Sequence, residues 1–222
     1  MACMDDSSAL STTELLSSLP EEALDRVAHR ATRVRLERNG VLFNEGDEAS
    51  AMYVVESGRI GIGKRSPDGR ESLVALIEPG DVFGEMPLFD EEPRSASARA
   101  LERSELLRLP YEAVRAELEA HPVALWGVAA LIARRLRTAD DAIADAMLLD
   151  VTGRTAKRLL ELAGTADEFV LPITQEELAG LVGASRERVN KALAAFVRLG
   201  WLEQSERRYR ILNRERLAQR SR

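Results

Sequence analysis

The chain has 222 residues, of which 45% are hydrophobic, so it is long enough for one large domain or two small ones with apolar cores. Its single cysteine, Cys3, excludes an internal disulfide and an iron–sulfur cluster held by four thiolates. The formal net charge of −6 argues against a chain that meets nucleic acid along its whole length.

The N-terminal stretch carries no targeting signal. Residues 1–20 lack a basic start followed by an apolar run, and no stretch of 18 consecutive apolar residues occurs anywhere. We therefore expect a cytoplasmic protein without a membrane-spanning segment. Residues 12–30 show an amphipathic pattern that Pro20 interrupts, which predicts short helices leading into a sheet.

From residue 33 onward the hydrophobic period changes to two, which is typical of strands. Ser66, Pro67, Asp68 and Gly69 form a strong hairpin-turn signal. Short strands separated by glycine turns predict an antiparallel sandwich or a jelly-roll barrel. The predicted strands lie near residues 33–37, 41–43, 52–55, 60–62, 73–77 and 106–109.

Residues 80–100 carry charges that a plain turn between strands does not explain. Gly84 and Glu85 are followed, nine residues after Glu85, by Arg94 and Ser95 among small residues. An arginine fork beside a hydroxyl can bind a phosphate, and an upstream carboxylate can accept from a sugar hydroxyl. One ligand with a phosphate and a ribose would engage both ends. The plainer interpretation is a surface turn in which Glu85 and Arg94 pair.

The histidine content weighs against metal chemistry. His29 and His121 are the two histidines of the chain, and they lie far apart in helical surroundings. No His-x-His cluster exists to hold a catalytic metal, although many jelly-roll proteins are metal enzymes. We predict that the chain is not an enzyme and keep a jelly-roll enzyme as a distant alternative.

Residues 111–120 predict a short helix, and a much longer one begins after His121 and Pro122. Its apolar and small residues recur at alternating steps of four and three, as in an a/d seam. The seam predicts a homodimer, although a helix buried in its own domain would show the same stripe. Gly153, just past the seam, predicts a hinge or a simple helix stop. The seam consists of Leu125, Ala129, Ile132, Leu136, Ala139, Ile143 and Ala146.

The C-terminal part differs in charge from the rest. Residues 151–222 hold 14 Lys and Arg against 9 Asp and Glu, whereas residues 1–150 hold 17 against 28. The balance suggests a basic module that meets phosphates, although a charged solvated surface would give the same count. Thr174 with Glu177 forms a capping box, Gly183 supplies a tight turn, and Ser185 caps a second helix. These signals indicate a helix-turn-helix, followed by a wing of two strands around residues 205–208.

The second helix of this motif presents polar residues near its N-terminal end, which reaches base edges in a major groove. Arginine and lysine can donate to guanine, and glutamate can accept from cytosine. In the plainer interpretation this is a solvated face on which Glu187 bridges to Lys191. The polar residues are Arg186, Glu187, Arg188, Asn190 and Lys191.

The stretch around Arg94 closely resembles the phosphate-binding cassette of cyclic-nucleotide-binding domains, and its matching residues are Phe83, Gly84, Glu85, Leu88, Phe89, Arg94, Ser95 and Ala96. The resemblance extends along nearly the whole chain to the cyclic AMP receptor (CRP/FNR) family of transcription regulators, including its actinobacterial members. It implies an α+β fold with an N-terminal jelly-roll β-roll that binds the nucleotide (1–121), a dimerisation helix and hinge (122–150), and a C-terminal winged helix-turn-helix (151–222).

The resemblance also implies roles for individual residues. The implied nucleotide-binding residues are Gly84, Glu85, Arg94, Ser95, Ala96, Arg135 and Asp140. The implied DNA-binding residues are Thr174, Gln175, Ser185, Arg186, Glu187, Arg188 and Lys191. The implied ligand is cyclic AMP, with cyclic GMP less favoured, and the implied partners are a second copy, palindromic DNA with TGTGA-like half-sites, and RNA polymerase.

The chain departs from the family at two positions that usually offer hydroxyl or amide groups to the adenine. These positions hold Ala139 and Asp140. Alanine cannot hydrogen-bond, and a carboxylate can accept from either an adenine amino group or guanine N–H groups. The same fold with DNA binding that is independent of the nucleotide therefore stays an alternative.

Overall fold

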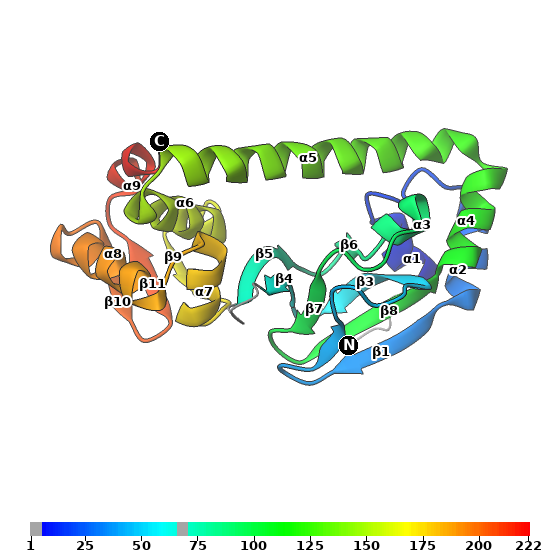
Figure 1. Cartoon of the computed structure of the whole chain (residues 1–222), viewed down its shortest axis with the longest axis horizontal. Helices are drawn as coiled ribbons and strands as arrows, with labels where there is room; N and C mark the ends of the chain where they lie inside the picture. Colours follow the sequence, from blue (N-terminus) through cyan, green and yellow to red (C-terminus); the bar gives the residue numbers. More distant parts are fainter. Residues whose placement is uncertain (1–5, 66–70) are drawn as a thin grey trace. The chain divides into compact units, whose positions relative to one another are not determined.

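The computed structural model describes residues 6–65 and 71–222, and the predicted turn at residues 66–69 lies outside them. The chain packs as two compact units (Figure 1). The N-terminal unit comprises the described residues up to 64 together with residues 75–137, and the C-terminal unit holds residues 138–222. Residues 71–74 are grouped with the C-terminal unit although they belong to a strand of the N-terminal sheets. The three-part functional division at residues 121 and 150 stays a prediction.

Two short helices open the N-terminal unit, and the second lies where the amphipathic pattern over residues 12–30 predicts a helix. They are α1 (Asp6–Ser11) and α2 (Glu21–Arg30), and Pro20 stands at the N-cap of α2. The leucines between and on these helices, including Leu15, Leu16 and Leu24, are buried in the main apolar core. The helices thus close one side of the sandwich that follows.

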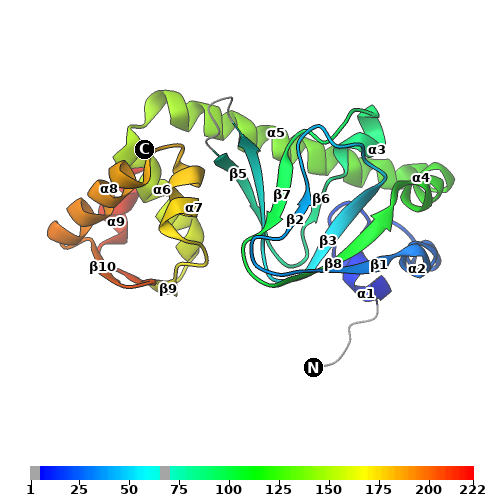
Figure 2. The same ribbon diagram turned by 60° about the horizontal axis from the view of Figure 1, so that its bottom comes forward.

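The sandwich consists of two four-stranded sheets, which confirms the predicted jelly-roll architecture (Figure 2). One sheet has the order β1-β8-β3-β6 and the other β2-β7-β4-β5. Strand β8 pairs with β1 and β3, β3 also pairs with β6, and β7 pairs with β2 and β4, each time in antiparallel register. The strands are β1 (Thr32–Leu36), β2 (Val41–Phe43), β3 (Ala51–Ser57), β4 (Ile60–Arg65), β5 (Glu71–Ile77), β6 (Val82–Phe83), β7 (Ser97–Ala100) and β8 (Ser104–Pro110).

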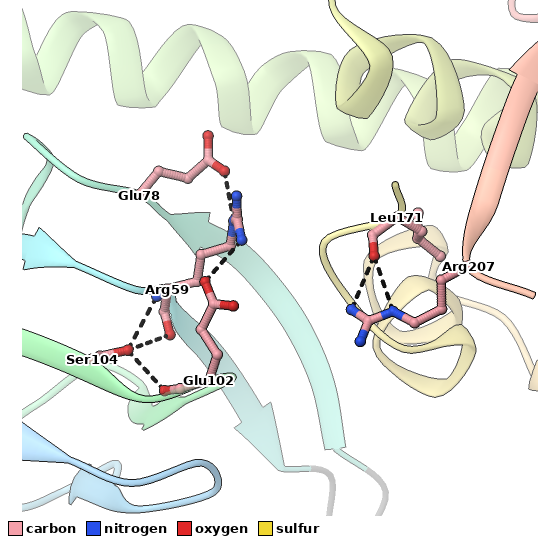
Figure 3. A network of polar contacts seen from close by, with 6 residues as sticks. All are labelled: Arg59, Glu78, Glu102, Ser104, Leu171 and Arg207. Atoms are coloured by element: carbon pink, nitrogen blue, oxygen red, sulfur yellow. Dashed lines mark hydrogen bonds and ion pairs between the residues drawn. The ribbon is translucent and has the colours of Figure 1, made fainter. Parts of the chain in front are cut away.

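Arg59 ties the turn between β3 and β4 to two neighbouring loops (Figure 3). Its Nε and Nη1 donate to Glu78 and Glu102, each at 2.8 Å. Its main-chain N–H donates to the buried Ser104 hydroxyl at 3.1 Å. Gly58 has φ +82°, and a Cβ there would lie 2.3 Å from Ser104 Oγ. The turn therefore requires glycine, because both the conformation and the contact exclude a side chain.

Two helices follow the sandwich. Helix α4 (Tyr111–Ala120) packs against α2 and β8 (Figure 2). After a 3₁₀ turn (Pro122–Ala124) the long helix α5 runs from Leu125 to Leu148. Within residues 6–65 and 71–222 no single helix is long and apolar enough to cross a membrane, and the bent pair Tyr111–Ala120 and Pro122–Leu148 meets the criteria only when both parts are combined.

An ion pair between the buried Glu117 and the half-exposed Arg26 joins α4 to α2. Glu117 accepts from Nε and Nη2 of Arg26 at 2.7 and 2.8 Å. This hydrogen bonding lowers the pKa of Glu117, burial opposes it, and the charges of Arg26 and His121 lower it further. The pKa of Glu117 in the folded chain therefore lies below its value in the unfolded chain, which is near 4.5. The stability that the ion pair contributes is complete above pH 4.5 and is lost as the pH falls below that value.

The Glu117→Gln variant is therefore expected to melt about 2–4 °C lower at pH 7, and its difference from the unsubstituted chain should shrink as the pH falls below 4.5. Thermal unfolding, followed by circular dichroism at several pH values, measures the melting temperature and its dependence on pH. The matched control is Glu112→Gln, since Glu112 pairs with Arg30 on the surface and its loss should shift the melting temperature by less than about 1 °C. A deficit that is independent of pH would contradict this account.

The C-terminal unit contains a helix-turn-helix and a small sheet of order β10-β11-β9. The wing therefore has β9 as a third strand beside the two predicted ones. The elements are α6 (Val151–Ala163), β9 (Glu168–Val170), α7 (Gln175–Val182), α8 (Arg186–Arg198), β10 (Leu202–Ser205), β11 (Arg208–Ile211) and α9 (Arg214–Arg220).

Gly153 does not stop a helix, so that interpretation was wrong, while the hinge stays a prediction. The break between α5 and α6 falls at Leu149 and Asp150, and the Asp150 carboxylate caps α6 by accepting from the Gly153 N–H at 2.8 Å. Gly153 thus lies in the first turn of α6. A Cβ there would lie 3.0 Å from the main-chain oxygen of Arg220, so the glycine allows the close approach of α9.

Candidate nucleotide and nucleic-acid sites

The cassette folds into a short helical turn that follows strand β6. Strand β6 ends at Phe83, Gly84 adopts φ +73°, and helix α3 (Met86–Asp90) follows. Gly84 must be glycine, because a Cβ would meet Arg94 Nη1 at 2.6 Å. The glycine therefore lets the arginine lie directly against the main chain.

Arg94 is 5% exposed, and its guanidinium lies inside the unit. Nη1 donates to the Gly84 carbonyl at 2.8 Å and to the Tyr111 hydroxyl at 3.1 Å, and Nη2 donates to the Ala51 carbonyl at 2.6 Å. The guanidinium carbon lies 4.1 Å from the centre of the Phe43 ring. The structure thus holds the predicted phosphate-binding residue in one orientation.

Glu85 is 2% exposed and forms an ion pair with Arg135 of α5, whose Nη2 also donates to the Val82 carbonyl at 2.6 Å. Gly84, Glu85, Arg94 and Arg135 therefore come together, as the sequence predicts. Glu85 and Arg94 do not pair with each other, so the simple turn with a Glu85–Arg94 ion pair is not what forms.

The remaining predicted nucleotide residues lie at the edge of this cluster or outside it. Ser95 is exposed and its hydroxyl lies 3.6 Å from the Met86 sulfur, while Ala96 is half-buried. Asp140 is exposed and belongs to the other compact unit. Their part in binding stays a prediction.

Two buried polar atoms at the cassette lack partners. Among the residues that the structure describes, Glu85 Oε2 and Arg94 Nε have no hydrogen-bond partner. A buried polar atom left unpaired costs about 1–3 kcal/mol, so such atoms are uncommon in folded proteins and each calls for an explanation. A carboxylate oxygen accepts from a hydroxyl and a guanidinium N–H donates to a phosphate. The two atoms thus match the two ends of a ribose phosphate.

Sequence reasoning missed two residues of this cluster, Tyr111 and Phe43. Tyr111 follows β8, and its hydroxyl donates to the Gly84 carbonyl while it accepts from Arg94. Burial raises the pKa of Tyr111 to about 12. No local pattern marks either aromatic residue, because each reaches Arg94 only through the folding of the sandwich.

The long helix α5 leaves its predicted seam open. Val128 and Leu131, on the other face, are buried in the N-terminal core. Ile132, Leu136 and Ile143 are 49%, 61% and 57% exposed. The seam is therefore not the stripe of a helix buried within its own chain, since its large apolar side chains are exposed.

The helix-turn-helix has the predicted local chemistry. Thr174 Oγ1 accepts from the Glu177 N–H at 3.2 Å, and Glu177 accepts from the Thr174 N–H at 2.7 Å. Gly183 adopts φ +67° between α7 and α8, and the Ser185 hydroxyl accepts from the Arg188 N–H. Val189, Leu193 and Phe196 are buried, so the core side of α8 is fixed.

The opposite face of α8 is open to solvent. Arg186, Glu187, Arg188 and Lys191 are exposed. Lys191 Nζ lies 2.7 Å from Glu187 Oε1, and this hydrogen bond lowers the pKa of Glu187. In the chain without DNA, Glu187 and Lys191 therefore pair with each other, as the interpretation of a solvated helix face expects. Both side chains remain accessible to a base edge, because they are more than 70% exposed.

The wing and the start of α7 line an open pocket of about 450 Å³. Three of the predicted DNA-binding residues line it, Thr174, Gln175 and Arg186, together with Arg207. Arg207 reaches back to the Leu171 carbonyl with Nε at 3.3 Å and Nη2 at 3.0 Å (Figure 3). This contact fixes the wing beside the helix-turn-helix.

The sequence matches two protein families. Residues 33–121 match the cyclic nucleotide-binding domain and residues 153–220 match the Crp-like helix-turn-helix domain. Among solved structures, the catabolite activator protein of Thermus thermophilus is 33% identical with a TM-score of 0.54, covering 94% of this chain and 98% of that one. FixK2 of Bradyrhizobium japonicum covers 86% of this chain and 98% of its own with a TM-score of 0.78, and its 24% identity supports the fold alone.

Curated relatives extend over most of the chain. The CRP-like cAMP-activated global transcriptional regulator of Mycobacterium tuberculosis is 37% identical over 220 residues, which cover 96% of this chain and 98% of the relative. The cyclic AMP receptor protein of Thermus thermophilus is 37% identical over 186 residues, covering 84% and 86%. These relatives are transcription regulators and not enzymes, which confirms that prediction. The chain therefore belongs to the CRP/FNR family of transcription regulators.

Proposed function

We propose that this chain is a homodimeric, cyclic-AMP-responsive regulator that binds palindromic DNA with TGTGA-like half-sites in the cytoplasm. The observation that carries the nucleotide part is the pair of unpartnered buried atoms, Arg94 Nε and Glu85 Oε2, on the two residues that a cyclic ribose phosphate would engage. Arg94 donates to the phosphate and Glu85 accepts from the ribose hydroxyl. Gly84, Ser95 and Ala96 bring main-chain groups close to the ligand.

The DNA part rests on the open face of α8 and on the open seam of α5. In a symmetric dimer two recognition helices meet successive major grooves, so a palindromic site follows from the two-fold symmetry. Arg186, Glu187 and Lys191 read bases, and Thr174, Gln175, Ser185 and Arg188 contact phosphates. RNA polymerase is the expected further partner of the DNA-bound dimer.

The two parts are coupled by a population shift. The nucleotide favours the arrangement of the α5 helices that presents both recognition helices to the DNA, so it binds more tightly to the chain on its operator. The alternative keeps the fold but uncouples the sites, and one feature favours it: Ala139 cannot bond the adenine as the usual polar residue does.

Calorimetry distinguishes these cases. Cyclic AMP and cyclic GMP are titrated into the full chain, and the cyclic AMP titration is repeated with a palindromic operator present. Tighter binding of cyclic AMP with DNA supports coupling, because linkage makes the effect reciprocal. Equal affinity with and without DNA supports the uncoupled alternative. If neither nucleotide binds, the sensor role is wrong.

The Glu187→Ala variant should relax discrimination at one base pair of each half-site by about tenfold, while its affinity for unrelated DNA changes by less than about threefold. The reason is that a carboxylate reads a cytosine amino group but repels the phosphates. Fluorescence anisotropy at fixed salt, with an operator and its single-base variants, measures both. Glu161→Ala removes the same charge from α6, where Glu161 pairs with Arg158, and should leave discrimination unchanged. A uniform loss over all sequences would argue against base reading.

A further inference from the structure

The guanidinium of Arg94 has more donors than its protein partners use. Nη1 makes two hydrogen bonds and Nη2 makes one, so three of the five N–H groups are engaged. Within the part of the chain that the structure describes, the buried Nε has no partner. The Nε–H and one N–H of Nη2 therefore remain, and a bidentate contact with a phosphate needs two such donors.

We propose that Tyr111 and Phe43 are positioning residues that fix the Arg94 guanidinium so that these two donors are presented to the phosphate of the nucleotide. This inference rests on the proposed function, since it concerns the same ligand. By this inference, two aromatic residues outside the cassette contribute to the affinity for the nucleotide. The cassette sequence alone would attribute that contribution to Arg94.

Tyr111 fixes the guanidinium by bonding on both sides. Its hydroxyl accepts from Arg94 Nη1 at 3.1 Å and donates to the Gly84 carbonyl, which itself accepts from the same Nη1 at 2.8 Å. The three groups form a closed triangle that restricts rotation of the guanidinium. Because the pKa of Tyr111 is raised to about 12, the hydroxyl keeps its proton and both roles at neutral pH.

Phe43 supports the flat face of the guanidinium. The distance from the Arg94 guanidinium carbon to the ring centre is 4.1 Å, close enough for a cation–π contact. Phe43 in turn packs on Tyr53 and Phe83, with ring centres 6.0 and 6.2 Å away. The face of the arginine is thus held by a buried aromatic cluster, and the ligand does not have to order the side chain on binding.

The opposite reading is that the same contacts hold Arg94 away from the ligand, so that the phosphate must first displace the carbonyls. The two readings predict opposite effects on the affinity for the nucleotide when the Tyr111 hydroxyl is removed. If Tyr111 prepares the site, its hydroxyl strengthens binding, whereas if it holds Arg94 back, removing the hydroxyl tightens binding. The unpartnered Nε favours preparation, because a side chain held at rest would be expected to satisfy its buried donors.

The test is calorimetric titration of cyclic AMP into the full chain and into the Tyr111→Phe variant. We expect binding about five- to twentyfold weaker in the variant, and a similar loss in Phe43→Leu. Tyr209→Phe, which removes a buried hydroxyl from the C-terminal unit, is the matched control and should bind as the unsubstituted chain does. Equal or tighter binding in Tyr111→Phe overturns the inference.

A double-mutant cycle separates positioning from a general loss of structure. In an Arg94→Lys background there is no planar fork to orient, so adding Tyr111→Phe should cost less than about twofold further. The same further loss in both backgrounds overturns the inference. If the unsubstituted chain itself does not bind cyclic AMP, the proposed function fails as well, so the two failures are distinguishable.

Discussion

The Arg94→Ala variant is expected to bind cyclic AMP at least about 100-fold more weakly than the unsubstituted chain. The substitution removes a charge-assisted fork, and a hydrogen bond to a charged group contributes about 1.5–3 kcal/mol. Titration calorimetry at fixed ionic strength measures the loss. Arg108→Ala is the control, because Arg108 lies on β8 with its Nη2 donating to the exposed Ser50 side chain.

The same substitution should also lower stability, because Arg94 satisfies the carbonyls of Ala51 and Gly84 inside the unit. A drop of a few degrees in the melting temperature is consistent with the proposed site. Binding is therefore measured well below the melting temperature of each variant. An Arg94→Ala protein that is folded and titrates like the unsubstituted chain would show that the cassette does not bind the phosphate.

The second large effect concerns the α5 seam. Replacing both Ile132 and Leu136 by aspartate is expected to convert the proposed dimer to a monomer, because it would place four charges in a two-helix apolar contact. Operator affinity should fall by at least about 100-fold, since each half-site is then bound alone and the gain from linking two sites is lost. Sedimentation velocity measures the assembly, and fluorescence anisotropy measures the DNA affinity.

The matched control for the seam is Ala130→Asp, which adds a charge to an exposed position of α5 off the stripe. It should leave both the assembly and the DNA affinity unchanged. If the double variant remains a dimer, another surface makes the contact. If it becomes a monomer that keeps full operator affinity, the proposed link between dimerisation and palindrome reading is wrong.

The sequence by itself determined the features that depend on local spacing. The alternation of apolar residues predicted the sandwich, the step of four and three predicted the seam, and Thr174, Gly183 and Ser185 marked the helix-turn-helix. These signals are readable because a period, a cap or a positive φ is set by neighbours within one or two turns of chain. The cassette residues could also be identified from the sequence, since they follow one another along a single stretch.

Only the tertiary structure decided how the site residues are held. Nothing near Arg94 in the sequence points to Phe43 or Tyr111, which reach it because β2 and the start of α4 meet the cassette in the folded sandwich. The same holds for Gly153, whose local signal suggested a hinge or a helix stop and whose close contact with α9 only the fold reveals. The period of apolar residues shows which face of an element is buried, but it does not show which residues from distant parts of the chain meet there.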